Sequence, residues 1–238
     1  MTDDKFANML RQTMIDLTER YSRPTELNIT LAGVTKAAVR LVPGVESADI
    51  LMISPPDGFE SLAATSPLAQ RIDALQREFQ EGPCVDAADG QPLVRCDDLQ
   101  NDQRWGKFGT SAAAGGVHSI LSFQLYTHNG SRAALNLLGL KPNTFTMEAE
   151  AIAGVIATHA ATALIAHNKE LQFQSALASR DAIGQAKGMI MERFGVGPVR
   201  AFELITQISQ NSNMRVVDVA AGIVARGPHR SIRIANLT

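Results

Sequence analysis

"SRDAIGQAKGMIMERFGVGPVRAFELITQISQNSNMRVVDVAAGIVARG", Ser179–Gly227, is the stretch that decides how this chain folds. Its apolar residues recur at helical spacing in three runs, over about 180–194, 198–210 and 215–225. Gly195 ends the first run, and Pro198 suits the first position of the next, because its missing N–H would be unpaired there anyway. The pattern therefore predicts three short helices. About fifty residues in three helices bury too little surface to fold alone, so they need a partner or a continuous helix that enters from upstream.

The same end of the chain is basic. Residues 180–238 hold eight Lys or Arg and four acids, whereas residues 1–179 hold fourteen and twenty. The net charge of −2 for the whole chain thus conceals +4 on the last quarter and −6 on the rest. Such an asymmetry favours a polyanion as the partner of the C-terminal part. Composition alone leaves RNA, DNA and an adaptor role open for a basic three-helix end.

The three-helix stretch resembles the ANTAR domain of bacterial transcription antitermination regulators. The resemblance rests on Ile183-Gly184-Gln185-Ala186-Lys187-Gly188-Met189-Ile190-Met191, then Ala201-Phe202, Ser209, Asn213 and Val216-x-Asp218-Val219-Ala220. It implies binding of paired, short-looped hairpins in nascent RNA, so that a terminator does not form and the RNA polymerase elongation complex is affected indirectly. Cationic side chains supply salt-sensitive affinity for phosphates, and unstacked loop bases can be read by side chains. The candidate RNA-binding residues are Gln185, Lys187, Gly188, Arg193, Ser209, Asn213 and Arg215.

The glycine after Lys187 is informative because glycine in a helix costs ~1 kcal/mol relative to alanine. Either a partner approaches the backbone closely at Gly188 or another helix packs there. Small residues on both sides of Lys187 leave its ammonium accessible to a phosphate or a base.

The larger N-terminal part alternates helices with strands. Helices are expected over 1–22, over 27–41 and after Pro67, and strands over 47–54, 59–66, 93–98, 117–126 and 132–140, with turns at "PPDG" and "THNG". This order predicts an α+β fold with an antiparallel sheet.

The motifs "QEGPC", "CDDL", "RWGKF", "GVHSILSFQL" and "AALNLLGLKPNTF" make residues 25–166 resemble a GAF domain, of the kind that precedes ANTAR domains in actinobacterial proteins. The resemblance implies a signal input, with a pocket between the sheet and the segment 68–105, but GAF domains bind diverse ligands or none. The candidate pocket residues are Cys84, Asp97, Arg104 and Trp105. The competing interpretations are a buried structural role for Cys84, a loop anchor for Trp105, and an ion pair of Arg104 with Asp97 or Asp98.

No proline interrupts residues 147–194, which predicts one helix of ~48 residues, roughly 70 Å long, that closes the GAF domain and becomes the first ANTAR helix. A short, half-polar seam with steps of three and four residues, together with the family resemblance, favours a homodimer. The seam consists of Leu164, Asn168, Leu171, Ser175, Ala178 and Ala182. The expected domains are an N-terminal helix (1–24), the GAF domain (25–166), a linker (167–179), the ANTAR domain (180–228) and a tail (229–238).

Two cysteines, no signal-peptide pattern and no expected membrane span favour a reduced, cytoplasmic protein. The cysteines lie twelve residues apart without partnered histidines, so neither a metal site nor a cofactor is expected. We expect a regulator and not an enzyme. The alternatives are a thiol-dependent GAF-type small-molecule reductase that uses Cys84 and Cys96, and a DNA-binding regulator. The DNA-binding alternative is weakened by a last helix without a run of base-reading side chains.

Overall fold

The computed structural model describes residues 7–9, 11–16, 27–54, 58–128 and 131–227, and the chain divides into two compact units, Met1–His167 and Asn168–Thr238. The helix expected over 1–22 is described only at 7–9 and 11–16, which are helical. The expected tail 229–238 and the centres of the two expected turns, 55–57 and 129–130, lie outside the described residues.

The first unit contains a five-stranded antiparallel sheet with the strand order β2-β1-β5-β4-β3. The expected α+β class with an antiparallel sheet is therefore confirmed. Side chains alternate between the two faces of each strand, and both faces of the central strands are buried. The strands are β1 (Ser47–Ser54), β2 (Gly58–Leu62), β3 (Leu93–Cys96), β4 (Ser119–His128) and β5 (Ser131–Gly139).

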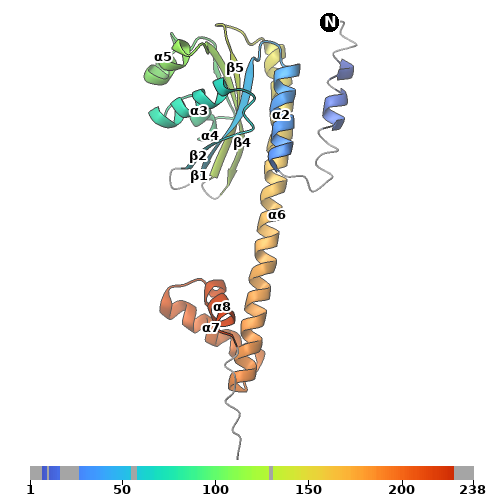
Figure 1. The fold of residues 1–238 in the computed structure, drawn as a ribbon, viewed down its shortest axis with the longest axis vertical. Helices are drawn as coiled ribbons and strands as arrows, with labels where there is room; N and C mark the ends of the chain where they lie inside the picture. The colour runs from blue at the N-terminus through green and yellow to red at the C-terminus, as the bar shows by residue number, and fades with distance from the viewer. Residues whose placement is uncertain (1–6, 10, 17–26, 55–57, 129–130, 228–238) are drawn as a thin grey trace, which may run out of the picture. The chain divides into compact units, whose positions relative to one another are not determined.

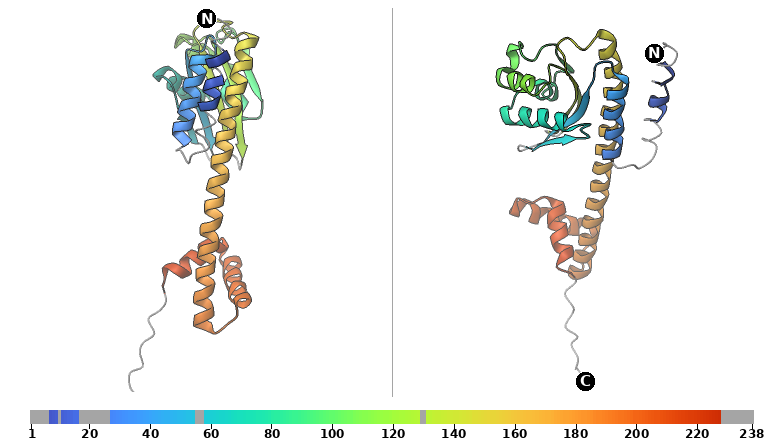
Figure 2. Two further views of the ribbon diagram at one scale, coloured as in Figure 1. Left: turned by 90° about the vertical axis from the view of Figure 1, so that its right-hand side faces the viewer. Right: turned by 45° about the horizontal axis from the view of Figure 1, so that its top comes forward.

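Helices cover both faces of this sheet (Figures 1 and 2). On one face lie α2 (Leu27–Leu41) and the first part of α6 (Met147–Phe194), which share a core with Ile50, Leu135 and Leu137. On the other face lie α3 (Pro67–Phe79), α4 (Pro83–Ala88) and α5 (Gly106–Ala114). The sheet thus separates the helix that continues into the second unit from the helices that surround the predicted pocket.

Two helices and one helical turn of this unit have no clear counterpart in the sequence pattern. The predicted break at "GPC" begins α4, and the small-residue run at 112–116 belongs largely to α5, preceded by the 3-10 turn η1 (Gln103–Trp105). The Glu81 carboxylate accepts the backbone N–H groups of Lys107 and Phe108 at 2.9 and 2.8 Å. This contact satisfies the first turn of α5 from 26 residues away, so no local periodicity signals the helix.

Helix α6 spans Met147–Phe194, as the absence of proline predicted. It is long and apolar enough, by length and composition alone, to cross a membrane, a test that the core helix of a soluble protein also passes. In its first half, apolar side chains are buried in the core of the first unit: Ala149, Ala153, Ile156, Ala160 and Leu164. Leu164 is fully buried there. Its place in the predicted dimer seam is therefore wrong, because the side chain already packs inside its own unit.

The second unit consists of the last part of α6, α7 (Pro198–Ser212) and α8 (Val216–Ala225). Pro198 occupies the start of α7, and Asn213 ends it in the left-handed conformation with φ 49°. The core of the unit is a small cluster from all three helices: Ala186, Ile190, Ala201, Ile205, Val219 and Ala220. The three predicted helices are thus confirmed, with the first of them continuous with α6.

Candidate functional site

The turn between α7 and α8 holds three of the predicted RNA-binding residues. The Ser209 hydroxyl donates to the Met214 carbonyl at 2.5 Å, and the residue is 9% exposed. Asn213 is exposed and adopts the left-handed backbone that asparagine tolerates better than most residues. The exposed Arg215 guanidinium donates to both carboxylate oxygens of Asp218 at 2.7 and 2.9 Å. Ser209 therefore holds the turn, while Asn213 and Arg215 are presented to solvent.

Lys187 lies beside an aromatic ring. Its ammonium is 6.0 Å from the centroid of the Phe202 ring, at the edge of cation–π range, and the Phe202 side chain is 42% exposed. The two residues come from α6 and α7, whose contact in the core brings them together. This geometry places a cation and an accessible aromatic face next to each other. Phe202 was expected to belong to the apolar face of its helix and was not among the predicted site residues.

The glycines around Lys187 leave open space. A Cβ placed on Gly184 or Gly188 would meet no heavy atom within 4 Å in the described structure. Helix packing among the described residues therefore does not explain either glycine. The remaining interpretation, close approach of a partner to the backbone, stays a prediction.

A hollow of about 810 Å³ lies along the same part of α6. It is lined by Gln185 and Lys187 and also by Ser179, Arg180 and Gly184, which were not among the predicted site residues. Their signal in the sequence is spacing: Arg180, Gly184 and Lys187 follow one another at steps of four and three, so they share a helix face. Arg193, Ser209, Asn213 and Arg215 do not line this hollow. The exposed Arg193 instead lies 5.9 Å from the ring of Phe194.

The predicted pocket residues of the first unit do not converge on one cavity. Trp105 is 2% exposed, and its Nε1 donates to Asp86 at 3.0 Å, so it anchors the loop as one interpretation expected. The Arg104 guanidinium stacks 4.1 Å from the Trp105 ring centroid. It pairs with Asp102 at 2.6 Å, and not with Asp97 or Asp98 as expected. Arg104 pairs with Asp102 because Asp102 lies only two residues away and caps the same turn by accepting the N–H of Arg104.

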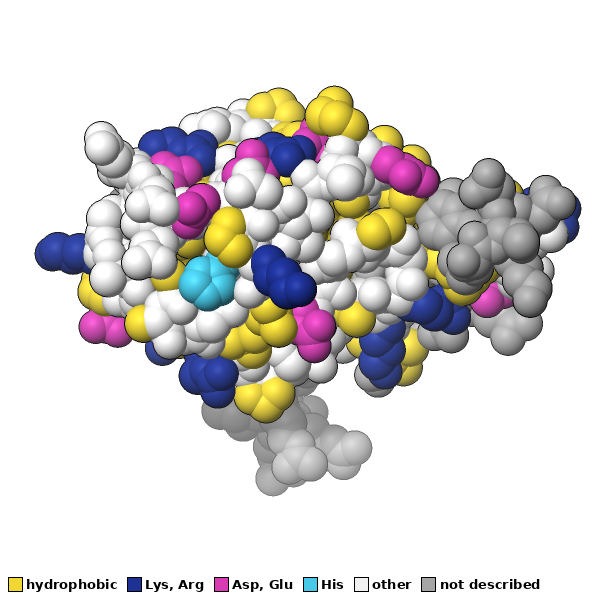
Figure 3. Space-filling view, turned by 90° about the horizontal axis from the view of Figure 1, so that it is seen from above, with side chains coloured by type: hydrophobic (Ala, Val, Ile, Leu, Met, Phe, Trp, Pro, Cys, Tyr) yellow, Lys and Arg dark blue, Asp and Glu magenta, His cyan; other side chains and the backbone are white. Residues whose placement is uncertain are grey.

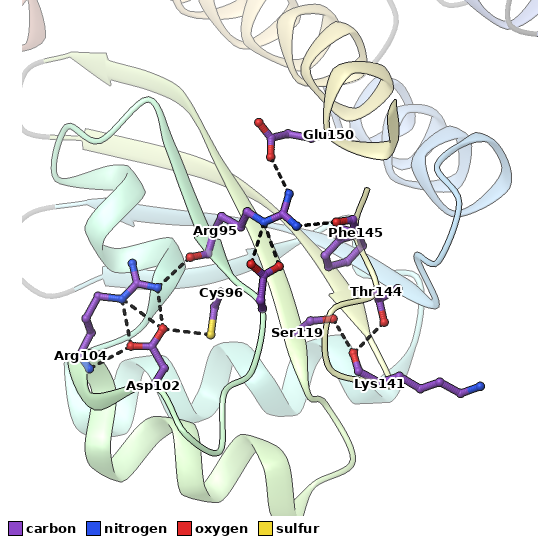
Figure 4. Close-up of polar contacts among 10 residues, drawn as sticks. Arg95, Cys96, Asp102, Arg104, Ser119, Lys141, Thr144, Phe145 and Glu150 are labelled. Atoms are coloured by element: carbon purple, nitrogen blue, oxygen red, sulfur yellow. Dashed lines mark hydrogen bonds and ion pairs between the residues drawn. The ribbon is translucent and has the colours of Figure 1, made fainter. Parts of the chain in front are cut away.

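Asp97 belongs to a different network, which Figure 4 places beside the start of α6. Arg95 donates to Asp97 at 2.8 Å, to Glu150 at 3.0 Å and to the Phe145 carbonyl at 2.5 Å. Arg104 in turn donates to the Arg95 carbonyl at 2.7 Å. These contacts link the η1 turn, strand β3 and the first turns of α6 in one chain of polar contacts.

Both cysteines are buried thiols. Cys84 is fully buried, and its Sγ lies 3.7 Å from the Ala134 carbonyl. Burial and the nearby Asp73 raise the pKa of the Cys84 thiol well above its ordinary value. Burial and a hydrogen bond to Asp102 raise the pKa of Cys96 to about 12. Both environments therefore disfavour the thiolate.

The sequence reasoning missed a small cavity of about 90 Å³ between α3 and strands β1 and β2. Asp73 and Ser61 line it, and the carboxylate of Asp73 belongs to a buried polar cluster with Asp49 and Asn136. The only signal in the sequence is that Asp49 and Asp73 each sit among apolar residues, in "ADILMI" and "LAQRIDALQ".

The distribution of charged side chains does not mark a binding site on the visible face of the first unit. On the face that Figure 3 shows, Lys and Arg side chains lie beside Asp and Glu side chains, without a patch of one sign. This view looks onto the first unit, and the candidate interface on α6 and α7 of the second unit consists of the contacts named above.

Comparison with protein-family models gives two consecutive matches: a GAF domain over residues 24–165 and an ANTAR domain over residues 171–224. The chain therefore belongs to the GAF–ANTAR regulators. In these proteins the ANTAR domain binds RNA in transcription antitermination and the GAF domain senses a signal. The first unit is accordingly called the GAF unit below, and the second the ANTAR unit.

Comparison with solved structures confirms the GAF fold. The free methionine-R-sulfoxide reductase of Neisseria meningitidis is 15% identical, with a TM-score of 0.53 over 71% of this chain and 96% of that one. The LuxR family factor CepR2 of Burkholderia cenocepacia is 17% identical, with a TM-score of 0.52 over 65% and 94%. The GAF domain of a Coxiella burnetii phosphoenolpyruvate-protein phosphotransferase is 17% identical, with a TM-score of 0.52 over 70% and 96%. At these identities the likeness concerns the fold alone. A search of curated proteins found no significant match.

Proposed function

We propose that the ANTAR unit binds paired, short-looped hairpins in nascent RNA and thereby prevents formation of a terminator, with the GAF unit as the signal input. The RNA polymerase elongation complex is then affected indirectly, through the structure of its transcript. The observation that carries the proposal is the position of Lys187 over the exposed ring of Phe202, beside the open helix surface at Gly184 and Gly188.

Each part of this surface suits a different part of a hairpin. The Lys187 ammonium and the Arg180 guanidinium supply contacts for the phosphate backbone. The half-exposed Phe202 ring offers a platform for an unstacked loop base, as aromatic side chains do in proteins that read single-stranded RNA. Asn213 and Arg215, at the α7–α8 turn, present hydrogen-bonding groups to solvent.

A mobility-shift titration with a paired-hairpin RNA tests the proposal. Lys187→Ala is expected to weaken binding about ten-fold and to reduce the slope of log affinity against log salt by about one, because one phosphate contact is lost. Arg200→Ala is the matched control, since Arg200 is exposed and paired with Glu203 at 2.9 Å. Equal losses for the two variants would reduce the effect to overall charge and refute a specific role for Lys187.

The DNA-binding alternative is separated by competition. Helix α8, "VVDVAAGIVA", carries Asp218 as its only charged residue and lacks the Arg, Asn and Gln side chains that read the major groove. We therefore expect hairpin RNA to displace duplex DNA of equal length. The reverse order of affinity would favour a DNA-binding regulator.

We further propose that the protein is a cytoplasmic homodimer whose seam lies on α6. Four large apolar side chains on this helix are exposed in the ANTAR unit: Leu171 (49%), Phe173 (60%), Leu177 (45%) and Phe194 (62%). Burying such side chains against a second copy would stabilise the helix and offer two RNA-binding surfaces to two hairpins. Sedimentation of the protein with and without Leu171→Lys tests this, and an unchanged monomer in both would refute the dimer.

We propose a regulatory and not an enzymatic role for the GAF unit. A thiol-dependent reductase needs a thiolate activated by a neighbouring cation, whereas burial raises the pKa of both Cys84 and Cys96. Mild peroxide is therefore expected to leave both thiols of the folded protein unoxidised, as mass analysis of the cysteine-containing peptides can determine. If peroxide rapidly oxidises the wild type, and the oxidation differs in the Cys96→Ser variant, the reductase alternative is supported instead.

A further inference from the structure

The buried face of the GAF sheet carries a polar cluster in which two carboxylates share one amide. Asn136 on β5 donates through Nδ2 to Asp49 on β1 at 2.9 Å and to Asp73 on α3 at 3.2 Å. Its side-chain oxygen accepts from Ser122 on β4 at 2.6 Å. None of these four residues is more than 3% exposed. The amide thus fixes one oxygen of each carboxylate and leaves the other oxygen of each to find another partner.

The second oxygens have none among the described residues. Asp49 Oδ2, Asp73 Oδ2, Ser61 Oγ and the donor Gln76 Nε2 are buried and form no hydrogen bond of normal geometry, although Ser61 and Asp49 lie close enough to Asp73 to influence its pKa. No Lys, Arg or His in the described part of the chain forms an ion pair with either carboxylate. An unpaired buried carboxylate is costly, so native proteins supply a counter-charge, a proton or water.

The 90 Å³ cavity gives access to this cluster. Ser61, Gln70, Asp73 and Arg77 form its polar lining, and Leu51 and Phe59 form an apolar wall. Because a water molecule occupies about 30 Å³ in the liquid, the volume suits a ligand of only a few heavy atoms. A ligand here meets the oxygen atoms of Asp73 and Ser61 at one end, and beside them the ring of Phe59, which favours an organic cation.

We propose that this cavity binds a small protonated primary amine, whose ammonium group donates to Asp73 Oδ2 and Ser61 Oγ while its carbon atoms contact Phe59 and Leu51. An ammonium carries three N–H donors on a compact charge, and both the Asp73 carboxylate and the Ser61 hydroxyl can accept from it. Asp49 adjoins Asp73 through the amide of Asn136 that they share. A bare divalent metal fits less well, since no group of three or more His, Cys, Asp or Glu suited to a metal occurs among the described residues.

Arg77 is the cationic side chain of the protein itself that could pair with Asp73 in place of the ammonium group of a ligand. It lines the cavity, is exposed, and follows Asp73 by one helical turn on α3, yet the two residues form no ion pair. Replacing Arg77 by Gln is therefore expected to leave amine affinity unchanged or to raise it. If Arg77→Gln abolishes amine binding, the cation in the cavity is not the ligand's ammonium and the proposal fails.

The proposal deepens the input role given to the GAF unit, but the binding step is independent of RNA. It is tested on the full chain without RNA, by urea unfolding followed through the fluorescence of Trp105, the single tryptophan, which is buried in the same half of the core. The probe is ethylammonium chloride, compared with tetramethylammonium chloride, potassium chloride and ethanol at constant ionic strength. At ten times its Kd, ethylammonium should raise the ratio of folded to unfolded protein about eleven-fold.

Tetramethylammonium carries the same charge without N–H donors, so it is expected to have no effect, like potassium and ethanol. Asp73→Asn should weaken ethylammonium binding at least ten-fold, and Ser61→Ala several-fold. Glu60→Gln, which removes an exposed carboxylate from the neighbouring position of β2, should leave it unchanged. Equal stabilisation by all three salts, no stabilisation by ethylammonium, or full affinity in Asp73→Asn would each overturn the proposal, whatever the outcome of the RNA titration.

Discussion

Replacing Asp73 by Asn removes the charge from a carboxyl group that burial leaves without a cation. Burial raises the pKa of Asp73 from its ordinary value of 3.8 to about 6. Asparagine keeps an oxygen that can accept from Asn136, and its new amide can donate to the unpaired Oδ2 of Asp49. We therefore expect Asp73→Asn to stabilise the GAF unit wherever the wild-type carboxyl is ionised.

The sign and size follow from linkage. Because the pKa of Asp73 is higher in the folded than in the unfolded state, protonation of this carboxyl stabilises the fold. This stabilisation is complete below about pH 4 and is lost as the pH rises through about 6. The interval from 3.8 to about 6 corresponds to about 3 kcal/mol, of which about half disappears between pH 5 and pH 8. Burial also raises the pKa of Asp49, which acts in the same direction. Asp102 acts oppositely, since Arg104 lowers its pKa to about 2, but its contribution is constant above pH 5.

The measurement is the free energy of unfolding from urea titrations at pH 5, 6, 7 and 8, followed by Trp105 fluorescence. The wild type should lose stability across this range, and Asp73→Asn should exceed it by up to about 3 kcal/mol at pH 8 and by about half of that at pH 5. Glu60→Gln should follow the wild type. If Asp73→Asn is the less stable protein at pH 8, the carboxylate has a counter-charge and the reasoning is wrong.

Three further predictions address other parts of the molecule. Asn213→Ala should reduce discrimination between the correct hairpin loop and a scrambled one more than it weakens binding to both, and equal losses would mean that Asn213 only holds the turn. Leu171→Cys, in a background without the two native cysteines, should form a disulfide-linked dimer to a different extent with and without RNA. If the yields are equal, and a Gly-Ser replacement of residues 172–177 leaves regulation unchanged, then the helix only tethers the two units. Glu81→Ala should destabilise the GAF unit by about 1–2 kcal/mol through loss of the N-terminal contacts of α5, whereas the exposed Glu78→Ala should not, as urea unfolding can determine.

The helices of the ANTAR unit and the long α6 could be predicted because their signals are local. Periodic apolar residues, a proline at the start of α7 and an unbroken run over 147–194 act within a few turns of the chain. The strands were found for the same reason, from alternation and turn residues. Helices α4 and α5 were missed because distant residues hold them: Gln76 accepts the N–H of Cys84, and Glu81 those of Lys107 and Phe108.

The acidic cluster could not be predicted for a related reason. Asn136 and Asp49 are 87 residues apart and meet only because β5 pairs with β1 in the centre of the sheet. The pairing of Arg104 was misjudged since three aspartates lie within seven residues of it, and only the geometry of the η1 turn selects Asp102. Candidate residues on one helix face were easier to group than residues that different strands and helices bring together.

The position of the acidic cluster suggests how a signal could reach the RNA-binding unit. Asn136 faces the two carboxylates, while its neighbours Leu135 and Leu137 point to the opposite face of β5 and share a core with Ile156 and Ala160 of α6. A cation that draws Asp49 and Asp73 together therefore acts on a strand whose other face packs against the output helix. Packed cores respond to such changes by moving between discrete arrangements and not by bending continuously. Helix α6 leaves the GAF core after Leu164 and contributes Ala186 to the ANTAR core, so one continuous helix joins the residues packed around Ile156 to the segment that holds Lys187.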